Sequence, residues 1–150
     1  MQKIMVVSGG FDPLHKGHIE YIKMAREFIG PEGLLIAIVN RDSFLLQKKG
    51  YKLLDENTRQ YIVQNLKDVD IATIAIDDDM TVNKTLEMIA SNNPDVDIYF
   101  GKGGDRNKDN IPEFETCQKY NIKIIDGLGA KIDSSSRIVE NVHIPAKIRW

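Results

Sequence analysis

Directly after the apolar run Ile4–Val7, the chain reads Ser8-Gly9-Gly10-Phe11-Asp12-Pro13-Leu14-His15-Lys16-Gly17-His18. The pattern predicts a buried strand, a glycine turn and the start of a helix. His15 and His18 are three residues apart, which places both side chains on one face of the first helical turn. Backbone N–H groups at a helix start are unpaired and favour anions, and imidazoles can become cationic near neutral pH. The stretch therefore predicts a phosphate site.

Two simpler interpretations of the histidine pair stay open at this point. Histidines at a helix start can act as a structural cap. A His-x-x-His pair with an aspartate nearby can also be part of a metal site, and here Asp12 would be that aspartate. Other parts of the chain have to decide between these interpretations.

The rest of the chain alternates between strand-like and helix-like segments. Strands are predicted at Lys3–Ser8, Leu34–Val39, Asp70–Ile76, Val96–Phe100 and Ile122–Ile125. Helices are predicted at Gly17–Phe28, from Asp55 onward, and at Val82–Ala90, Pro112–Tyr120 and Ser134–Glu140. The segment Arg41–Lys52 is predicted to be a mobile basic loop, with a short helical piece as an alternative for part of it.

This alternation predicts an α/β fold: a doubly wound, Rossmann-like, five-stranded parallel sheet with helices on both faces. We expect a single domain over residues 1–150, because no linker, repeat or low-complexity tract interrupts the chain. In such a sheet the loops after the strands share one edge, where ligands bind. Four features fall on that edge: the opening stretch, Lys48 and Lys49, the turn Gly103-Gly104-Asp105-Arg106, and the helix start Ser134-Ser135-Ser136-Arg137.

The opening stretch resembles the G-x-F-D-x-x-H-x-G-H signature of the cytidylyltransferase-like nucleotidyltransferases. The serine run resembles a second signature of these proteins, S-[ST]-[ST]-x-I-[IVR], through Ser134 to Val139. Lys102-Gly103-Gly104-Asp105 resembles the K-G-G-D of heptose-phosphate adenylyltransferases. The R-T-E-G-I-S-T-T signature of glycerol-3-phosphate cytidylyltransferase is absent, which favours ATP modestly over CTP.

The resemblance implies a role for each matching residue. His15, His18 and Lys49 would be catalytic. Lys48, Arg59 and Arg137 would contact the acceptor or the triphosphate, with Lys48 an equal candidate for the lysine role by register. The nucleotide would be bound by Gly9, Gly10, Phe11, Asp12, Gly17, Gly103, Asp105, Ser134, Ser135 and Ser136.

The implied reaction is an attack by a phosphorylated acceptor on the α-phosphate of a nucleoside triphosphate, which releases pyrophosphate. A sugar or polyol phosphate is the acceptor that the resemblance favours, and a glycerol-3-phosphate-type cytidylyltransferase is the alternative. Mg²⁺ is expected to arrive with the triphosphate, with no protein ligand assigned to it. A nucleotide-binding regulator without turnover and a metal-dependent hydrolase using His15 and His18 remain as other classes.

Composition limits the partners and the compartment. The 150 residues carry a net charge of −2, which gives no broad basic field for nucleic acid. One cysteine, Cys117, excludes an internal disulfide and fits a reducing compartment. The first strand begins too early for a signal peptide, and no apolar run is long enough to span a membrane. We expect a cytoplasmic protein, with a homodimer as one option for its mixed apolar and basic tail, residues 142–150.

Overall fold

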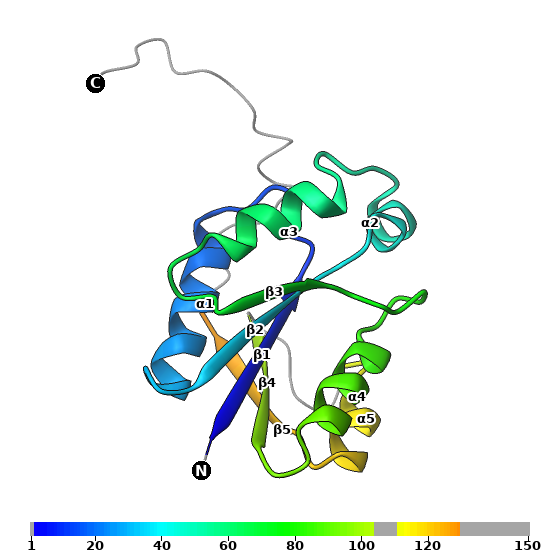
Figure 1. Ribbon diagram of the computed structural model, residues 1–150. Coiled ribbons are helices and arrows are strands. Elements are labelled where there is room, and N and C mark those ends of the chain that lie inside the picture. The colour runs from blue at the N-terminus through cyan, green and yellow to red at the C-terminus, as the bar shows by residue number, and fades with distance from the viewer. Residues whose placement is uncertain (1, 104–110, 130–150) are drawn as a thin grey trace, which may run out of the picture.

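Five parallel strands form one sheet in the computed structural model, which describes residues 2–103 and 111–129. The strands are β1 (Lys3–Gly9), β2 (Leu34–Val39), β3 (Ile71–Ile74), β4 (Asp97–Gly103) and β5 (Lys123–Leu128), in the spatial order β3-β2-β1-β4-β5. From β1 the chain first adds β2 and β3 on one side, and it then returns to add β4 and β5 on the other side (Figure 1). This topology confirms the predicted doubly wound, five-stranded parallel sheet.

Helices cover both faces of this sheet (Figure 1). They are α1 (Lys16–Ile29), α2 (Asp42–Lys49), α3 (Glu56–Gln64), α4 (Asn83–Asn92) and α5 (Phe114–Lys119). Buried side chains of α1 and α3 belong to one apolar cluster, and those of α4 and α5 belong to a second cluster. Successive residues of β1 alternate between the clusters, so Ile4 and Val6 face α4 and α5 while Met5 and Val7 face α1 and α3. A strand buried on both faces explains why Ile4–Val7 is continuously apolar.

For the segment Arg41–Lys52, the alternative of a short helical piece is confirmed in place of the mobile loop. Its larger part is the helix α2, which ends at Gly50 in the left-handed conformation with φ 84°. Leu45 is the buried residue of this helix, and the Asp42 amide at its start donates to the Glu56 carboxylate at 2.8 Å. The segment has little helical amphipathicity because it buries one side chain and exposes most of the others. The tertiary contacts of Leu45 and Glu56 therefore decide its conformation.

Two predicted boundaries also shift at the sheet edge. The strand β4 runs to Gly103, so Gly103 belongs to a strand and not to the predicted turn. The strand β3 spans only Ile71–Ile74, shorter than the predicted Asp70–Ile76. The predicted helix Ser134–Glu140 lies outside the described residues. In the described part of the chain, no helix has the length and apolar character needed to cross a membrane.

Candidate active site

The two histidines stand at the first turn of α1, at the edge where β1 ends. His15 is the residue that precedes the helix, with extended backbone angles, and His18 lies in the first turn. The two imidazole rings stack, with their centroids 3.8 Å apart. The ring of His18 also meets the edge of the Phe11 ring at a centroid distance of 5.0 Å. The predicted placement of both histidines on one face of the first turn is confirmed.

Both rings use their Nδ1 atoms to hold the helix start. The Gly17 amide donates to His15 Nδ1 at 3.0 Å, and the His15 amide donates to His18 Nδ1 at 3.1 Å. The His18 amide is paired with the His15 carbonyl. The helix start therefore has fewer unpaired amides than the sequence suggested, because the histidines themselves cap it.

This capping sets the position of the ring protons. An Nδ1 atom that accepts a hydrogen bond carries no proton, so the proton of a neutral imidazole resides on Nε2. The neutral ring of His18 thus has its Nε2–H on the side opposite the helix amides. Capping and ligand binding are compatible here, because they use different nitrogens of the same ring.

The electrostatic environment keeps His18 neutral. Burial is the main cause that lowers the pKa of His18 to about 3, and the electrostatic effects of His15 and Lys49 act in the same direction. The expectation that this imidazole becomes cationic near neutral pH is therefore wrong for the unliganded protein. At pH 7, His18 is a neutral hydrogen-bond donor.

The two lysines at the end of α2 face different surroundings. Lys49 is half-buried and its charge acts on His18, whereas Lys48 is exposed. The Nζ atom of Lys49 lies 5.9 Å from the centre of the Tyr51 ring, and that of Lys48 lies 5.7 Å from the centre of the Phe44 ring. The sequence left these two lysines equal, and the structure brings the charge of Lys49 close to the histidine pair.

The turn between β1 and α1 is tightly packed around Phe11. Phe11 is buried and has a φ of 52°, a left-handed backbone conformation that is uncommon for a residue with a side chain. Its ring lies over Gly9, where an added Cβ atom would come within 3.1 Å of Phe11 Cζ. A Cβ atom on Gly10 would approach Leu45 Cδ2 to 2.8 Å. The glycines allow the turn to pack between the sheet and α2.

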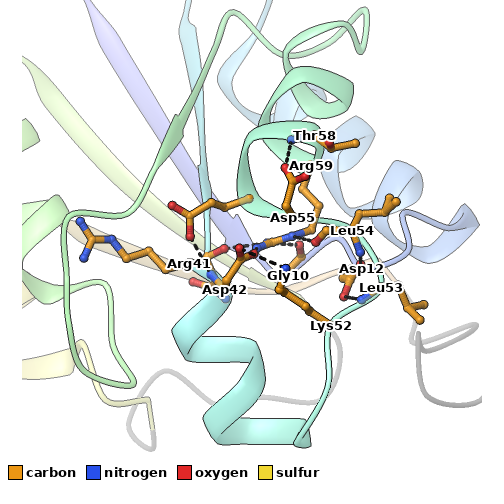
Figure 2. A network of polar contacts seen from close by, with 12 residues as sticks. Gly10, Asp12, Arg41, Asp42, Lys52, Leu53, Leu54, Asp55, Thr58 and Arg59 are labelled. Carbon is orange, nitrogen blue, oxygen red and sulfur yellow. Dashed lines mark hydrogen bonds and ion pairs between the residues drawn. The ribbon is translucent and has the colours of Figure 1, made fainter.

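Asp12 ties this turn to the segment after α2. Its carboxylate is fully buried and accepts from the amides of Leu53 at 2.7 Å and Leu54 at 2.8 Å (Figure 2). The geometry supports a role for Asp12 in holding the chain, and not in assisting a metal. Both carboxylate oxygens are occupied by backbone donors.

Arg59 has a different environment from the expected phosphate site. Its side chain is fully buried, and its guanidinium pairs with the Asp42 carboxylate at 2.8 Å. It also donates to three backbone carbonyls, those of Gly10 at 2.9 Å, Asn40 at 2.6 Å and Leu54 at 2.9 Å (Figure 2). The implied contact of Arg59 with the acceptor or triphosphate stays a prediction, and the structure gives its guanidinium other partners. The residue is a buried connector of the loops around the site.

The sequence reasoning missed the partners of this network. Asp42 went unnoticed because its segment was taken as a loop, and Asn40 because it was treated as the end of a strand. For Asn40 the sequence did carry a signal. A polar residue directly after five buried strand positions is usually hydrogen-bonded to the backbone. The Asn40 amide donates to the Gly9 carbonyl at 2.9 Å, which continues the β1–β2 pairing into the turn.

The remaining predicted residues fall into two groups. Gly17 lies in the first turn of α1, and Gly103 ends β4 on the same edge of the sheet. The others lie outside the described residues: Asp105, Ser134, Ser135, Ser136 and Arg137.

We tested the described residues against a metal held by the protein. Within residues 2–103 and 111–129, no three His, Cys, Asp or Glu side chains come together as such a site would require. Asp12, the carboxylate considered as a metal ligand beside the histidines, has both oxygens engaged by amides. The described residues therefore do not fit a protein-bound metal, and we derive no step through one.

Comparisons with known proteins agree with this geometry. The profile of the cytidylyltransferase-like family matches residues 6–141. The FAD synthase of Methanobrevibacter ruminantium is 37% identical over 105 residues, which cover 69% of this chain and 67% of that protein. The bifunctional protein HldE of Pelobacter propionicus is 29% identical over 145 residues, which cover 94% of this chain but only 27% of HldE.

A solved structure gives the same picture. The crystal structure of the lipopolysaccharide core biosynthesis protein from Thermoplasma volcanium GSS1 superposes with a TM-score of 0.64 at 29% identity, covering 85% of this chain and 97% of that one. The family profile spans most of the sequence, and both histidines lie at the strand–helix turn. These two observations define the class of protein. The chain belongs to the cytidylyltransferase-like family and is a nucleotidyltransferase.

The first prediction concerns the buried arginine. Arg59→Met should lower the free energy of unfolding by about 3–5 kcal/mol, because it leaves the Asp42 carboxylate and three carbonyls without their buried donor. Lys52→Ala is the matched control, since Lys52 also pairs with Asp42 but at 3.6 Å and with an exposed side chain. It should cost less than about 1 kcal/mol. Urea unfolding measures both, and equal losses would contradict the role of Arg59.

The second prediction concerns the pH dependence of stability. The pKa of His18 is about 3 in the folded chain against an ordinary value of 6.5, so between these values only the unfolded chain binds the proton. Stability should therefore fall as the pH drops below 6.5, by about 2 kcal/mol from this group between pH 7 and pH 5. His18→Gln should remove that part of the loss in urea titrations. Identical losses in the variant and the wild type would show that His18 is not held neutral.

Proposed function

We propose that this protein is an adenylyltransferase that joins AMP from ATP to a phosphorylated acceptor, with FMN as the first acceptor to test. A terminal phosphate oxygen of the acceptor attacks the α-phosphorus of ATP. The new P–O bond forms as the bond from the α-phosphorus to the bridging oxygen of pyrophosphate breaks. The product is a dinucleotide, which for FMN is FAD, and pyrophosphate leaves.

One observation carries the reaction class in this proposal. The stacked pair His15 and His18 caps α1 through Nδ1, which leaves the proton of neutral His18 on Nε2, with the charge of Lys49 acting nearby. The attacking phosphate is already ionised, so the reaction needs positioning and stabilisation of negative charge more than a general base. Because the pKa of His18 is about 3, its ring holds no second proton near neutral pH and does not serve as a general acid. We therefore assign His18 to hydrogen bonding of α-phosphate oxygens.

The other residues have supporting roles in the proposal. The backbone at Gly9, Gly10, Phe11 and Gly17, together with Gly103, would line the nucleotide. Lys49 would neutralise triphosphate or acceptor phosphate, with Lys48 as the outer of the two lysines. Asp105 would accept from ribose hydroxyls, and Ser134, Ser135, Ser136 and Arg137 would hold the β- and γ-phosphates. Mg²⁺ would come bound to the triphosphate, since phosphates and water are its usual ligands in such sites.

The choice of ATP and FMN draws on the relatives. FAD consists of AMP joined to FMN, and several of the relatives are named FAD synthase, including one from Aciduliprofundum boonei that is 34% identical over 120 residues. The resemblance of residues 102–105 to K-G-G-D also favours adenine, and with HldE it keeps a sugar phosphate as the second acceptor.

A pyrophosphate-release screen tests the proposal. It crosses ATP, CTP, GTP and UTP with FMN, a heptose phosphate and glycerol 3-phosphate, and mass spectrometry identifies each product. ATP with FMN should give the fastest release and a product with the mass of FAD. Preference for CTP with glycerol 3-phosphate would replace this proposal with a cytidylyltransferase. Nucleotide binding without release from any pair would favour a regulator.

Variants of His18 test its assigned role. His18→Ala should lower turnover by at least about 100-fold, equivalent to about 2.7 kcal/mol of barrier, because it removes the Nε2–H donor. His18→Gln should retain more activity than His18→Ala, since its side-chain amide can place a neutral donor near the Nε2 position. Initial rates with saturating ATP measure both. Near-normal turnover of a correctly folded His18→Ala protein would remove His18 from the mechanism.

A further inference from the structure

The central strand β1 is paired unequally on its two sides. Toward β2, its pairing continues along the strand to Gly9, opposite Val39. Toward β4, its pairing ends at Val6, opposite Phe100, although β1 continues to Gly9 and β4 continues to Gly103. The two strands therefore separate at their carboxyl ends, within the described part of the chain.

The hydroxyl of Tyr21 lies where the next rung of this ladder would be. Extending the register from Val6 and Phe100 by two residues would make the Ser8 amide donate to the Gly101 carbonyl. Instead, the Ser8 amide donates to Tyr21 Oη at 3.3 Å, and Tyr21 Oη donates to the Gly101 carbonyl at 2.5 Å. The hydroxyl replaces one direct hydrogen bond with two, so both backbone groups stay paired while the strands are apart.

Two glycines provide the space for the tyrosine. A Cβ atom on Gly103 would lie 3.2 Å from Tyr21 Cδ1 and 3.1 Å from the Leu128 carbonyl oxygen. Gly129, with φ 74°, lies against the backbone of Tyr21, and a Cβ atom there would come within 3.2 Å of the Tyr21 amide nitrogen. The ends of β4 and β5 thus approach Tyr21 closely on one side, and β1 lies on its other side.

The two strands separate at the point where the order of strand addition reverses. The chain leaves β1 toward β2, and it later returns to place β4 on the opposite side of β1. In open α/β sheets, ligands bind outside the carboxyl ends of the strands at this switch point. The glycine turn and the histidine pair follow β1 at the same place.

We propose that Tyr21 is a positioning residue whose hydroxyl holds β1 and β4 apart and so sets the width of the nucleotide site. This inference rests on the proposed function for the identity of the ligand, but not for the role of the hydroxyl as a spacer. Without the hydroxyl, the Ser8 amide and the Gly101 carbonyl have no bridge, and direct pairing is the simplest way to satisfy both. The turn that carries His15 and His18 would then move toward β4.

The experiment compares Tyr21→Phe with the matched control Tyr61→Phe, which removes a hydroxyl from an exposed tyrosine on α3. NMR detects a direct Ser8–Gly101 hydrogen bond as a scalar coupling between the Ser8 amide nitrogen and the Gly101 carbonyl carbon. We expect this coupling in Tyr21→Phe and in neither Tyr61→Phe nor the wild type. Calorimetry well below the unfolding temperature should show the Kd for ATP rising by roughly tenfold or more in Tyr21→Phe alone.

The outcomes separate this inference from the proposed function. A direct Ser8–Gly101 coupling in the wild type would overturn the spacer role, and this measurement does not depend on how well Tyr21→Phe folds. Unchanged ATP affinity in a folded Tyr21→Phe protein would show that the spacing does not control the site. If the wild type binds no nucleotide, the proposed function fails, and the coupling measurements alone decide whether Tyr21 separates the strands.

Discussion

The buried guanidinium of Arg59 is the interaction on which the geometry of the site depends. It reaches from α3 to the turn after β1 through Gly10, to the end of β2 through Asn40, and to the start of α2 through Asp42. A buried cation is costly unless it is paired and fully hydrogen-bonded, and here a carboxylate and three carbonyls meet that requirement. These loops cannot move independently, because displacement of any one of them leaves a buried charge or a carbonyl without a partner.

His18 is held as a neutral donor by its own surroundings. A cationic ring would attract phosphate more strongly, but burial and the charge of Lys49 oppose protonation of His18. In the proposed reaction, Lys49 would carry charge, while His18 would offer a fixed hydrogen bond whose direction is set by the cap at Nδ1. A donor held in place needs little reorganisation when negative charge develops on a phosphate, which is the condition for effective electrostatic catalysis.

Several features could be predicted because they depend on local pattern. The apolar runs Ile4–Val7 and Leu34–Val39 indicate strands buried on both faces, and the spacing of His15 and His18 indicates a shared helix face. The contacts of Asp12 and Arg59 could not be predicted this way, because their partners are distant in sequence. Asp12 and Leu53 are 41 residues apart, and Arg59 and Gly10 are 49 residues apart. The helix α2 could be predicted only as an alternative for a related reason, since one buried leucine and a distant glutamate stabilise it.

The sequence by itself determined the class of fold and the placement of His15 and His18 on one face at the helix start, because strand and helix periodicity and helix-start spacing are short-range properties. Only the tertiary structure decided how the stretch is used. It showed Nδ1 atoms capping the helix, His18 held neutral by burial, the charge of Lys49 acting on His18, and the Tyr21 hydroxyl bridging β1 and β4. Ring tautomer, pKa and strand spacing depend on which distant groups come within a few ångströms, and spacing along a chain does not encode that directly.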